Sequence, residues 1–168
     1  MIRMGGTILA GLLGLAFGSF LNVCLSRWPQ GESIVHPRSH CRNCSHTLAW
    51  WENVPLVSWL ALRGRCRECR TWIGWRYPIV EAAVAGLWAA QVWRLTSDIS
   101  SELLGTAPDV HFNFFYPIPP IGMMLFSWIL VALLALDAEH LWLPDFLTLP
   151  GIGTGILYSI VLDRKSVV

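Results

Sequence analysis

Four long apolar segments alternate with polar segments along the chain. The apolar runs cover residues 7–25, 77–93, 121–136 and 147–162. A helix of about 20 apolar residues crosses the roughly 30 Å hydrocarbon core of a lipid bilayer. Charged residues make up only 14% of the chain, against about 25% in an average soluble domain. The pattern predicts an all-α polytopic membrane protein with about four transmembrane helices.

The polar segment 26–76, between the first two runs, is strongly basic. It holds eight arginines against three glutamates, whereas segment 94–113 holds one arginine against three acidic residues. Basic loops stay on the cytoplasmic side of a membrane, so we expect 26–76 in the cytoplasm and 94–113 outside. An arginine-rich loop could also bind nucleic acid. Beside a membrane, however, arginines more often fix the topology or contact anionic lipid headgroups. We therefore expect the lipid bilayer, and no nucleic acid, as a partner.

Two Cys-x-x-Cys pairs lie inside this basic loop. Cys41 and Cys44 form the first pair, Cys66 and Cys69 the second, and twenty-one residues separate the pairs. Each pair turns the backbone so that two thiolates converge, and two such pairs make the closed Cys₄ set of a structural zinc site. The alternatives are two disulfides, which need an oxidising compartment, four unrelated thiols, or an iron–sulfur centre. The fifth cysteine, Cys24, lies in an apolar run and is expected to be a buried small residue.

Acidic residues lie near the ends of two predicted membrane helices. Glu81 stands inside the second apolar run, where it is either part of a functional site or paired with a loop arginine. Asp137 directly follows the run 121–136, which should desolvate its carboxyl group and raise its pKa. Asp137 is therefore either a catalytic group or, together with Glu139 and Asp145, one of several solvated loop residues. We expect Glu139 to be solvated in either case.

Five strings occur in the order in which type IV prepilin peptidases carry them, and the chain resembles this family from about residue 11 to residue 162. The strings are Gly18-Ser-Phe-Leu-Asn22-Val-Cys, the two Cys-x-x-Cys pairs, Glu52-Asn-Val-Pro55-Leu-Val-Ser58-Trp59-Leu, Trp75-Arg76-Tyr77-Pro78-Ile-Val-Glu81 and Asp137-x₆-Pro144-Asp145-x-x-Thr148-Leu-Pro150. The resemblance implies a multi-pass aspartic protease of the bacterial inner membrane. Its substrates would be the leaders of type IV prepilins and type II secretion pseudopilins, cut at the cytoplasmic face. Many family members also methylate the new N-terminus, with S-adenosylmethionine as the methyl donor.

The resemblance also assigns roles by position. It implies that Asp137 is the first of the family's two catalytic aspartates and that Asp145 supports it. The four loop cysteines match the family's zinc ligands, which are Cys41, Cys44, Cys66 and Cys69. Residues 7–93, with the zinc loop 26–76, correspond to the N-terminal prepilin-peptidase domain. Residues 114–162 correspond to the start of the aspartic peptidase membrane domain.

The chain departs from the family pattern in one respect. The second catalytic aspartate of the family follows a Gly-x-Gly-Asp motif well downstream, and the similar string here reads Gly151-Ile-Gly153-Thr154. We therefore expect a C-terminally truncated enzyme that is inactive alone. Residues 163–168 are interpreted as a non-native tail, because their codons would match a sequencing-library adapter. The alternatives are a non-catalytic short homologue and a membrane-anchored zinc-loop binding protein.

Overall fold

The protein is a bundle of long helices with a folded loop at one end. The computed structural model describes residues 2–103, 120–141 and 144–163. The four predicted apolar runs lie in four long helices, which are α1 (Ile2–Arg27), α3 (Arg76–Leu103), α4 (Pro120–His140) and α5 (Asp145–Asp163). The loop between α1 and α3 contains the short helices η1 (Trp28–Gln30), η2 (Trp50–Asn53) and α2 (Val57–Ala61). Apart from two isolated β-bridges, the regular structure of the described residues is helical, as the sequence predicts.

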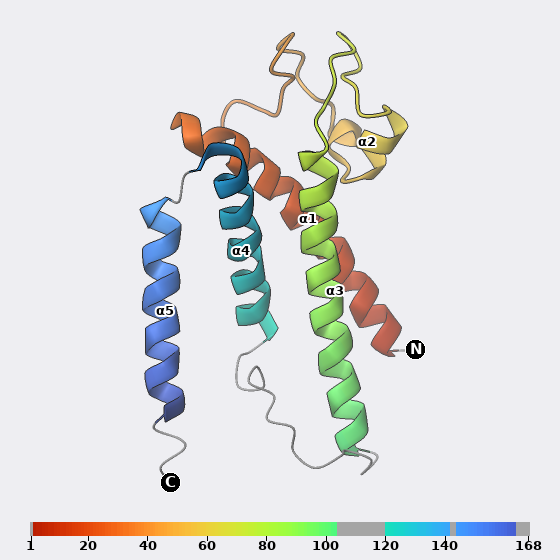
Figure 1. Ribbon diagram of the computed structural model, residues 1–168. Helices are drawn as coiled ribbons and strands as arrows, with labels where there is room; N and C mark the ends of the chain where they lie inside the picture. Colours follow the sequence, from red (N-terminus) through yellow and green to blue (C-terminus); the bar gives the residue numbers. More distant parts are fainter. Residues whose placement is uncertain (1, 104–119, 142–143, 164–168) are drawn as a thin grey trace.

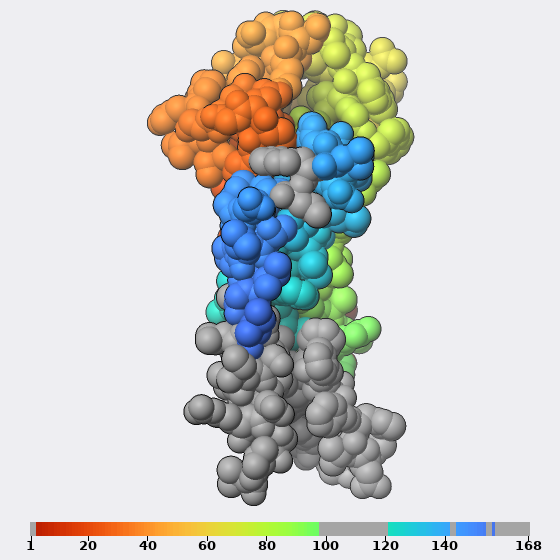
Figure 2. Space-filling view, turned by 60° about the vertical axis from the view of Figure 1, so that its left-hand side comes forward, coloured from red at the N-terminus to blue at the C-terminus, as the bar shows by residue number. Residues whose placement is uncertain are grey.

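Consecutive long helices run in opposite directions, so the loop side of the bundle is well defined. Helix α1 runs toward the loop, α3 leads away from it, α4 returns and α5 leads away again (Figure 1). In Figure 2 the loop forms a broad head, and the end of α4 and the start of α5 lie directly beneath it. Residues that the chain separates widely are therefore brought to the same end.

Two segments are long and apolar enough to cross a membrane by length and composition. They are Arg3–Gln30, which contains α1, and Ile121–His140, which contains most of α4. Helix α3 is more polar, because it carries Glu81 near its start and three charged residues toward its end. The coarse prediction of a helical protein with membrane-spanning candidates is thus confirmed for the described chain.

One predicted boundary is wrong. We expected an outer loop over 94–113, but α3 continues to Leu103. Charged residues alone do not end a helix, since arginine and glutamate are good helix formers and aspartate is tolerated. Residues 104–113, the start of the predicted domain at 114–119 and the predicted tail at 164–168 lie outside the described residues.

The core is formed by α1, α3 and α4. Leu21, Leu25, Val84 and Leu136 are among its fully buried side chains. Cys24 is also fully buried in this cluster, which confirms that it is a small core residue. In helices of membrane-spanning length, these side chains stabilise the bundle mainly through close van der Waals packing.

Two tryptophans link α4 to α3 and α1 through hydrogen bonds. The indole N–H of Trp88 on α3 donates to the backbone oxygen of Met124 on α4, at 3.1 Å. The indole N–H of Trp128 on α4 donates to the backbone oxygen of Phe17 on α1, also at 3.1 Å. Each bond satisfies a donor that would be costly to leave unpaired in an apolar setting.

Helices α1 and α3 make backbone contact at two glycines. A Cβ atom added to Gly14 would lie 2.7 Å from the Cα of Ala85, and one added to Gly18 would lie 2.8 Å from the Cα of Glu81. The missing side chains therefore let the two helix backbones approach more closely than any other residue would allow. The Gly14-x-x-x-Gly18 spacing serves packing within this chain.

We predict that Gly14→Ala destabilises the protein, because its new methyl group can only be accommodated by separating two backbones. Overpacking of this kind typically costs about 1–3 kcal/mol. Gly86→Ala is the matched control, since a Cβ there meets nothing within 4 Å. Thermal unfolding of the detergent-purified variants measures the difference. Equal stability of the two variants would contradict the close α1–α3 contact.

Candidate metal centre and carboxylate face

The two Cys-x-x-Cys pairs fold as two copies of one backbone turn. In the first copy, the Cys41 amide donates to the His46 carbonyl oxygen and the Ser45 amide donates to the Cys41 carbonyl oxygen, both at 2.9 Å. The second copy repeats both bonds twenty-five residues later, from Cys66 to Thr71 at 2.9 Å and from Arg70 to Cys66 at 3.1 Å. The two turns are the adjoining tips at the top of Figure 1.

The residue after each second cysteine adopts a left-handed backbone. Ser45 and Arg70 both have φ of 59°, a conformation that costs an L-residue roughly 1–2 kcal/mol. The same strained geometry at both positions indicates that the surrounding turn, and not the local sequence, sets the backbone there. The turn directs both thiols of each pair toward the other pair.

The four sulfur atoms form a compact cluster. Cys41 Sγ lies 3.7 Å from Cys69 Sγ, and Cys44 Sγ lies 3.9 Å from Cys66 Sγ. All four lie within 4.8 Å of one another. Sulfur atoms bonded to one tetrahedral zinc ion at about 2.3 Å are about 3.8 Å apart, whereas the sulfurs of a disulfide are about 2.05 Å apart. The cluster therefore has the dimensions of a metal site, and all four cysteines are free thiols.

The surroundings of Cys69 favour its ionised form. The hydroxyl and backbone N–H of Thr71 stabilise the thiolate and lower the pKa of the Cys69 thiol to about 5. Metals bind thiolates, and each ligand must lose its proton first. Within the cluster, Cys69 therefore loses its proton most readily, whereas desolvation and hydrogen bonds with the neighbouring thiols raise the pKa of Cys44.

Asp137 and Asp145 lie at the loop side of the bundle, one at the end of α4 and the other at the start of α5 (Figure 1). Both side chains are exposed. The expected desolvation of Asp137 is wrong, because Leu136 points into the core and the next residue of a helix is rotated by about 100° away from it. The structure leaves both carboxylates accessible on the same end of the molecule.

Glu139 is exposed, as expected, but it also forms an ion pair. Its Oε2 accepts a hydrogen bond of 2.6 Å from the guanidinium of Arg76, at the first position of α3. This pair joins the residue where the loop ends to the last turn of α4, which also carries Asp137. No sequence pattern points to it, because the two partners are sixty-three residues apart.

Glu81 is buried, with 6% of its surface exposed. Its Oε2 accepts a hydrogen bond of 2.7 Å from the backbone N–H of Leu56, just before α2. In the described chain no arginine pairs with it, so the alternative of an ion pair with the loop is wrong. The carboxylate instead links the start of α2 to the first turns of α3 through this hydrogen bond.

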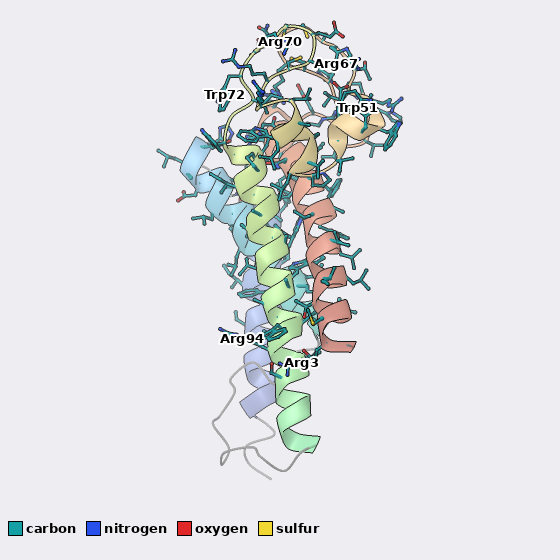
Figure 3. The ribbon with its side chains drawn as sticks, turned by 90° about the vertical axis from the view of Figure 1, so that its right-hand side faces the viewer. Arg3, Trp51, Arg67, Arg70, Trp72 and Arg94 are labelled. Atoms are coloured by element: carbon teal, nitrogen blue, oxygen red, sulfur yellow. The ribbon has the colours of Figure 1, made fainter. Side chains whose placement is uncertain are left out.

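Arginines are concentrated in the head. Figure 3 shows Arg67 and Arg70 there, with Arg67 beside Trp51, and Arg3 and Arg94 near the opposite end of the helices. The Arg67 guanidinium lies 5.1 Å from the centre of the Trp51 ring. The head thus keeps the basic character that the sequence gives to residues 26–76.

Comparison with known proteins decides the family. The family model described as "Bacterial Peptidase A24 N-terminal domain" matches residues 12–95, half of the chain. The chain belongs to this peptidase family. The match spans the cysteine loop and the two helices that carry it, which confirms the resemblance to the prepilin peptidases.

Three relatives extend the similarity beyond this domain. The chain is 42% identical to the "Prepilin leader peptidase/N-methyltransferase" of Myxococcus xanthus over 155 residues, which are 92% of the chain and 41% of that protein. It is 36% identical to the protein of that name from Pseudomonas aeruginosa, over 87% of the chain and 52% of the relative. It is 37% identical to the "Type 4 prepilin-like proteins leader peptide-processing enzyme" of Escherichia coli, over 89% of the chain and 55% of the relative.

The chain spans about half the length of these curated relatives. No solved structure matches it significantly. The cysteine head and the helix ends that carry Asp137 and Asp145 both fall within the part of the family that the chain covers.

We predict one metal ion per chain, bound by the four clustered cysteines. Replacing Cys66 with Ser removes a ligand from a closed site and should abolish stoichiometric binding, whereas Cys24→Ala, away from the cluster, should retain it. Elemental analysis of the purified protein measures the content. Chelation should also speed proteolysis of the head, because metal binding supplies folding energy. Metal retained by the fourfold Cys→Ser variant would contradict the assignment.

Proposed function

We propose that this chain forms the N-terminal part of a prepilin leader peptidase. The protein would cut the leaders of type IV prepilins and type II secretion pseudopilins at the cytoplasmic face of the bacterial inner membrane. The observation that carries the proposal is the placement of Asp137 in the last turn of α4, the helix end that lies beneath the cysteine head, on a chain that is 42% identical to a named prepilin leader peptidase. The Arg76–Glu139 hydrogen bond supports the same arrangement, because it holds the two parts together.

We assign zinc to the cysteine cluster and give it a structural role. Four thiolates in a tetrahedral set are typical of structural zinc, which leaves no position open for water or substrate. The head has few buried apolar side chains of its own, so the ion would supply much of its folding energy. Loop residues on both sides of the cluster would then be ordered only in the metal-bound protein.

All four long helices would cross the membrane in this proposal. Only 17% of the α4 span is buried within the protein, so its apolar side chains face outward, as they do in a helix surrounded by lipid. The eight arginines of 26–76 favour the cytoplasmic side of the membrane for the head. The connection between α4 and α5, with Asp137 and Asp145, would lie on the same side.

Cleavage by an aspartic protease requires two carboxylates that share one proton. The ionised group takes a proton from the attacking water while the protonated group polarises the scissile carbonyl. Asp137 would supply one of them, and Asp145 would support it from the start of α5. The relatives are about twice as long, and we expect the second catalytic carboxylate in the part of the family that these residues do not cover.

The names of the relatives include N-methyltransferase, so we extend the proposal to methylation of the new N-terminus. S-adenosylmethionine would supply the methyl group. The head lies on the side where a cleaved substrate would present its amine.

A fusion series tests the topology. Alkaline phosphatase, which is active only in the periplasm, should be inactive when fused after Arg70 and active when fused after Asp109. Eight arginines in one loop are expected to hold that loop inside. High phosphatase activity of the fusion after Arg70 would show that the head lies in the periplasm, which would contradict the proposed orientation.

Asp137→Asn should abolish leader cleavage, because a neutral amide cannot accept the proton of the attacking water. Loss of a general base costs at least about 10²-fold in rate. The assay joins residues 1–162 to the remaining part of the Myxococcus xanthus relative and follows prepilin processing in cells that lack their own enzyme. The metal content of the Asp137→Asn chimera should equal that of the unchanged chimera.

Asp98→Asn is the matched control, since it makes the same chemical change toward the other end of α3 and should process prepilin normally. Full processing by the Asp137→Asn chimera would exclude Asp137 as a catalytic residue. Processing by the 168-residue chain alone would show that the second carboxylate is already present, with Asp145 as the first candidate.

A further inference from the structure

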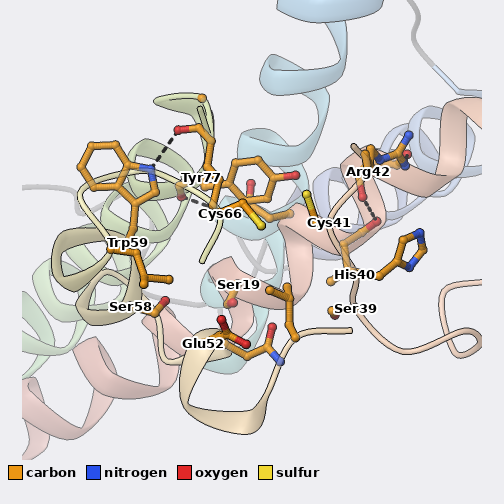
Figure 4. A pocket seen from close by; sticks show the side chains of 18 of the residues that line it. Ser19, Ser39, His40, Cys41, Arg42, Glu52, Ser58, Trp59, Cys66 and Tyr77 are labelled. Carbon is orange, nitrogen blue, oxygen red and sulfur yellow. Dashed lines mark hydrogen bonds between the residues drawn. The ribbon is translucent and has the colours of Figure 1, made fainter. Parts of the chain in front are cut away.

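Helix α2 has one side turned toward the inside of the head and another turned away from it. Its residues Ser58 and Trp59 line a cavity of about 530 Å³ between the head and the loop-side ends of α1 and α3 (Figure 4). Val57 and Leu60 are not part of that lining, and both side chains are exposed. Residues three positions apart share one face of a helix, so α2 presents an apolar face to the outside of the head.

Three tryptophans connect α2 to the start of α3. The ring centre of Trp59 lies 4.6 Å from that of Trp75, the residue directly before α3. Trp72 contacts both rings, with centres 5.7 and 5.8 Å away. The Trp59 indole N–H also donates to the Ile73 backbone oxygen at 3.1 Å, drawn as the dashed line at Trp59 in Figure 4. The position of α2 beside α3 is therefore fixed by ring contacts and by a hydrogen bond.

Exposed apolar side chains continue from α2 onto α3. Ile79 lies one turn after Trp75, and its backbone N–H donates to the Trp75 carbonyl oxygen at 3.2 Å. We call Val57, Leu60, Trp75 and Ile79 the α2 apolar surface, and each of the four is between 60% and 71% exposed. Ile79 belongs to the apolar run 77–93, which crosses the membrane in the proposed function. The α2 apolar surface is thus continuous with a side of α3 that would face lipid.

A hydrogen bond sets the depth of α2 along the bundle. The backbone N–H of Leu56, the residue before α2, donates to Oε2 of Glu81 at 2.7 Å. Glu81 follows Arg76, the first residue of α3, by five positions, and five residues extend roughly 7 Å along a helix. Figure 1 shows α2 beside the start of α3, with the two cysteine turns further from the helices. Helix α2 therefore lies at the level where α3 would enter the membrane.

The residues around this surface favour a lipid headgroup layer as its partner. Arg63 and Arg65 follow α2 directly and are exposed, and neither belongs to the ion pairs that the described residues form. Tryptophan is enriched at the boundary between headgroups and acyl chains, and arginine is attracted to anionic lipids. An apolar helix face flanked by basic residues is typical of elements that lie in the plane of this boundary.

We propose that the α2 apolar surface lies in the headgroup region of the cytoplasmic leaflet. Val57 and Leu60 would contact acyl chains there, and Arg63 and Arg65 would contact anionic phosphates. This inference rests on the proposed function, which places α3 across the membrane and the head on the cytoplasmic side. The head would then be held at the membrane surface by lipid contact through α2 as well as by α1 and α3.

Photo-cross-linking tests the contact in the full 168-residue chain, in nanodiscs of phosphatidylcholine and phosphatidylglycerol. Benzoylphenylalanine takes the place of Leu60 in one variant, of Leu87 in a second and of Glu68 in a third. Leu87 is an exposed residue within the apolar run of α3, and Glu68 is exposed between the two cysteines of the second turn. We expect lipid adducts at Leu60 and Leu87 and none at Glu68.

Hydrogen exchange measures how firmly α2 is held. Leu60→Glu should speed amide exchange of residues 57–62 about tenfold or more, because it places a charge among acyl chains, whereas Leu60→Met should not. Arg63→Gln combined with Arg65→Gln should speed this exchange about fivefold or more in nanodiscs with phosphatidylglycerol, but not in phosphatidylcholine alone. Metal content confirms that the head of each variant is folded. Equal exchange in Leu60→Glu and Leu60→Met would overturn the inference.

The cross-linking outcomes separate this inference from the proposed function. Lipid adducts at Leu87 but not at Leu60 would overturn the inference and leave the membrane placement of α3 intact. If neither position formed lipid adducts, that placement would fail, and the inference with it. Adducts of Leu60 with a second protein chain in place of lipid would also overturn the inference, because the surface would then be a contact between subunits.

Discussion

The close contact between α1 and α3 is the constraint on which the rest of the structure depends. Gly14 and Gly18 allow the two helix backbones to touch, and the helices run in opposite directions. The two ends of the intervening loop are thereby held side by side. The loop then needs few long-range contacts of its own, because the helices have already brought its ends together and reduced the entropy cost of closing it. The two repeated turns, together with the metal ion proposed for the four thiols, would then supply the remaining folding energy of the head.

The other features follow from this pair of helices. Helix α4 packs on it through the shared core and the two indole hydrogen bonds. This packing brings the end of α4 to the side of the head, where Arg76 holds Glu139. A carboxylate at that end can meet a scissile bond near the membrane surface without drawing polar backbone into lipid. In this way a contact deep in the bundle determines where the proposed chemistry takes place.

The sequence predicts features that depend on local pattern. The four long helices follow from apolar runs of membrane-spanning length, and the cysteine cluster follows from the spacing of two Cys-x-x-Cys pairs. The burial of Cys24 follows from its position in such a run. The end of α3 was misplaced because charged residues were assigned to a loop, although such residues alone do not end a helix.

Tertiary features could not be predicted in the same way. The Arg76–Glu139 pair joins residues with no common motif, and Asp137 is exposed because a rotation of one helical position takes it out of the core. Asn22 and Glu52, which each bury an oxygen without a hydrogen-bond partner in the described chain, lie thirty residues apart on separate elements. Only the fold makes both residues part of the lining of one cavity. A polar residue inside an apolar run, such as Asn22, is the one local signal that could have pointed there.

The central claim is that the head and the Asp137 end of α4 form one functional unit, and exchanging the charges of the pair that joins them tests it most directly. In the chimera, Arg76→Glu and Glu139→Arg should each lower prepilin processing, because each places two like charges where the structure has a hydrogen bond of 2.6 Å. The double variant restores opposite charges and should recover most of the activity, which is the signature of a direct interaction. The account would be contradicted if the loss of processing in the double variant equalled the sum of the losses in the two single variants. Full activity of the single variants would also contradict it.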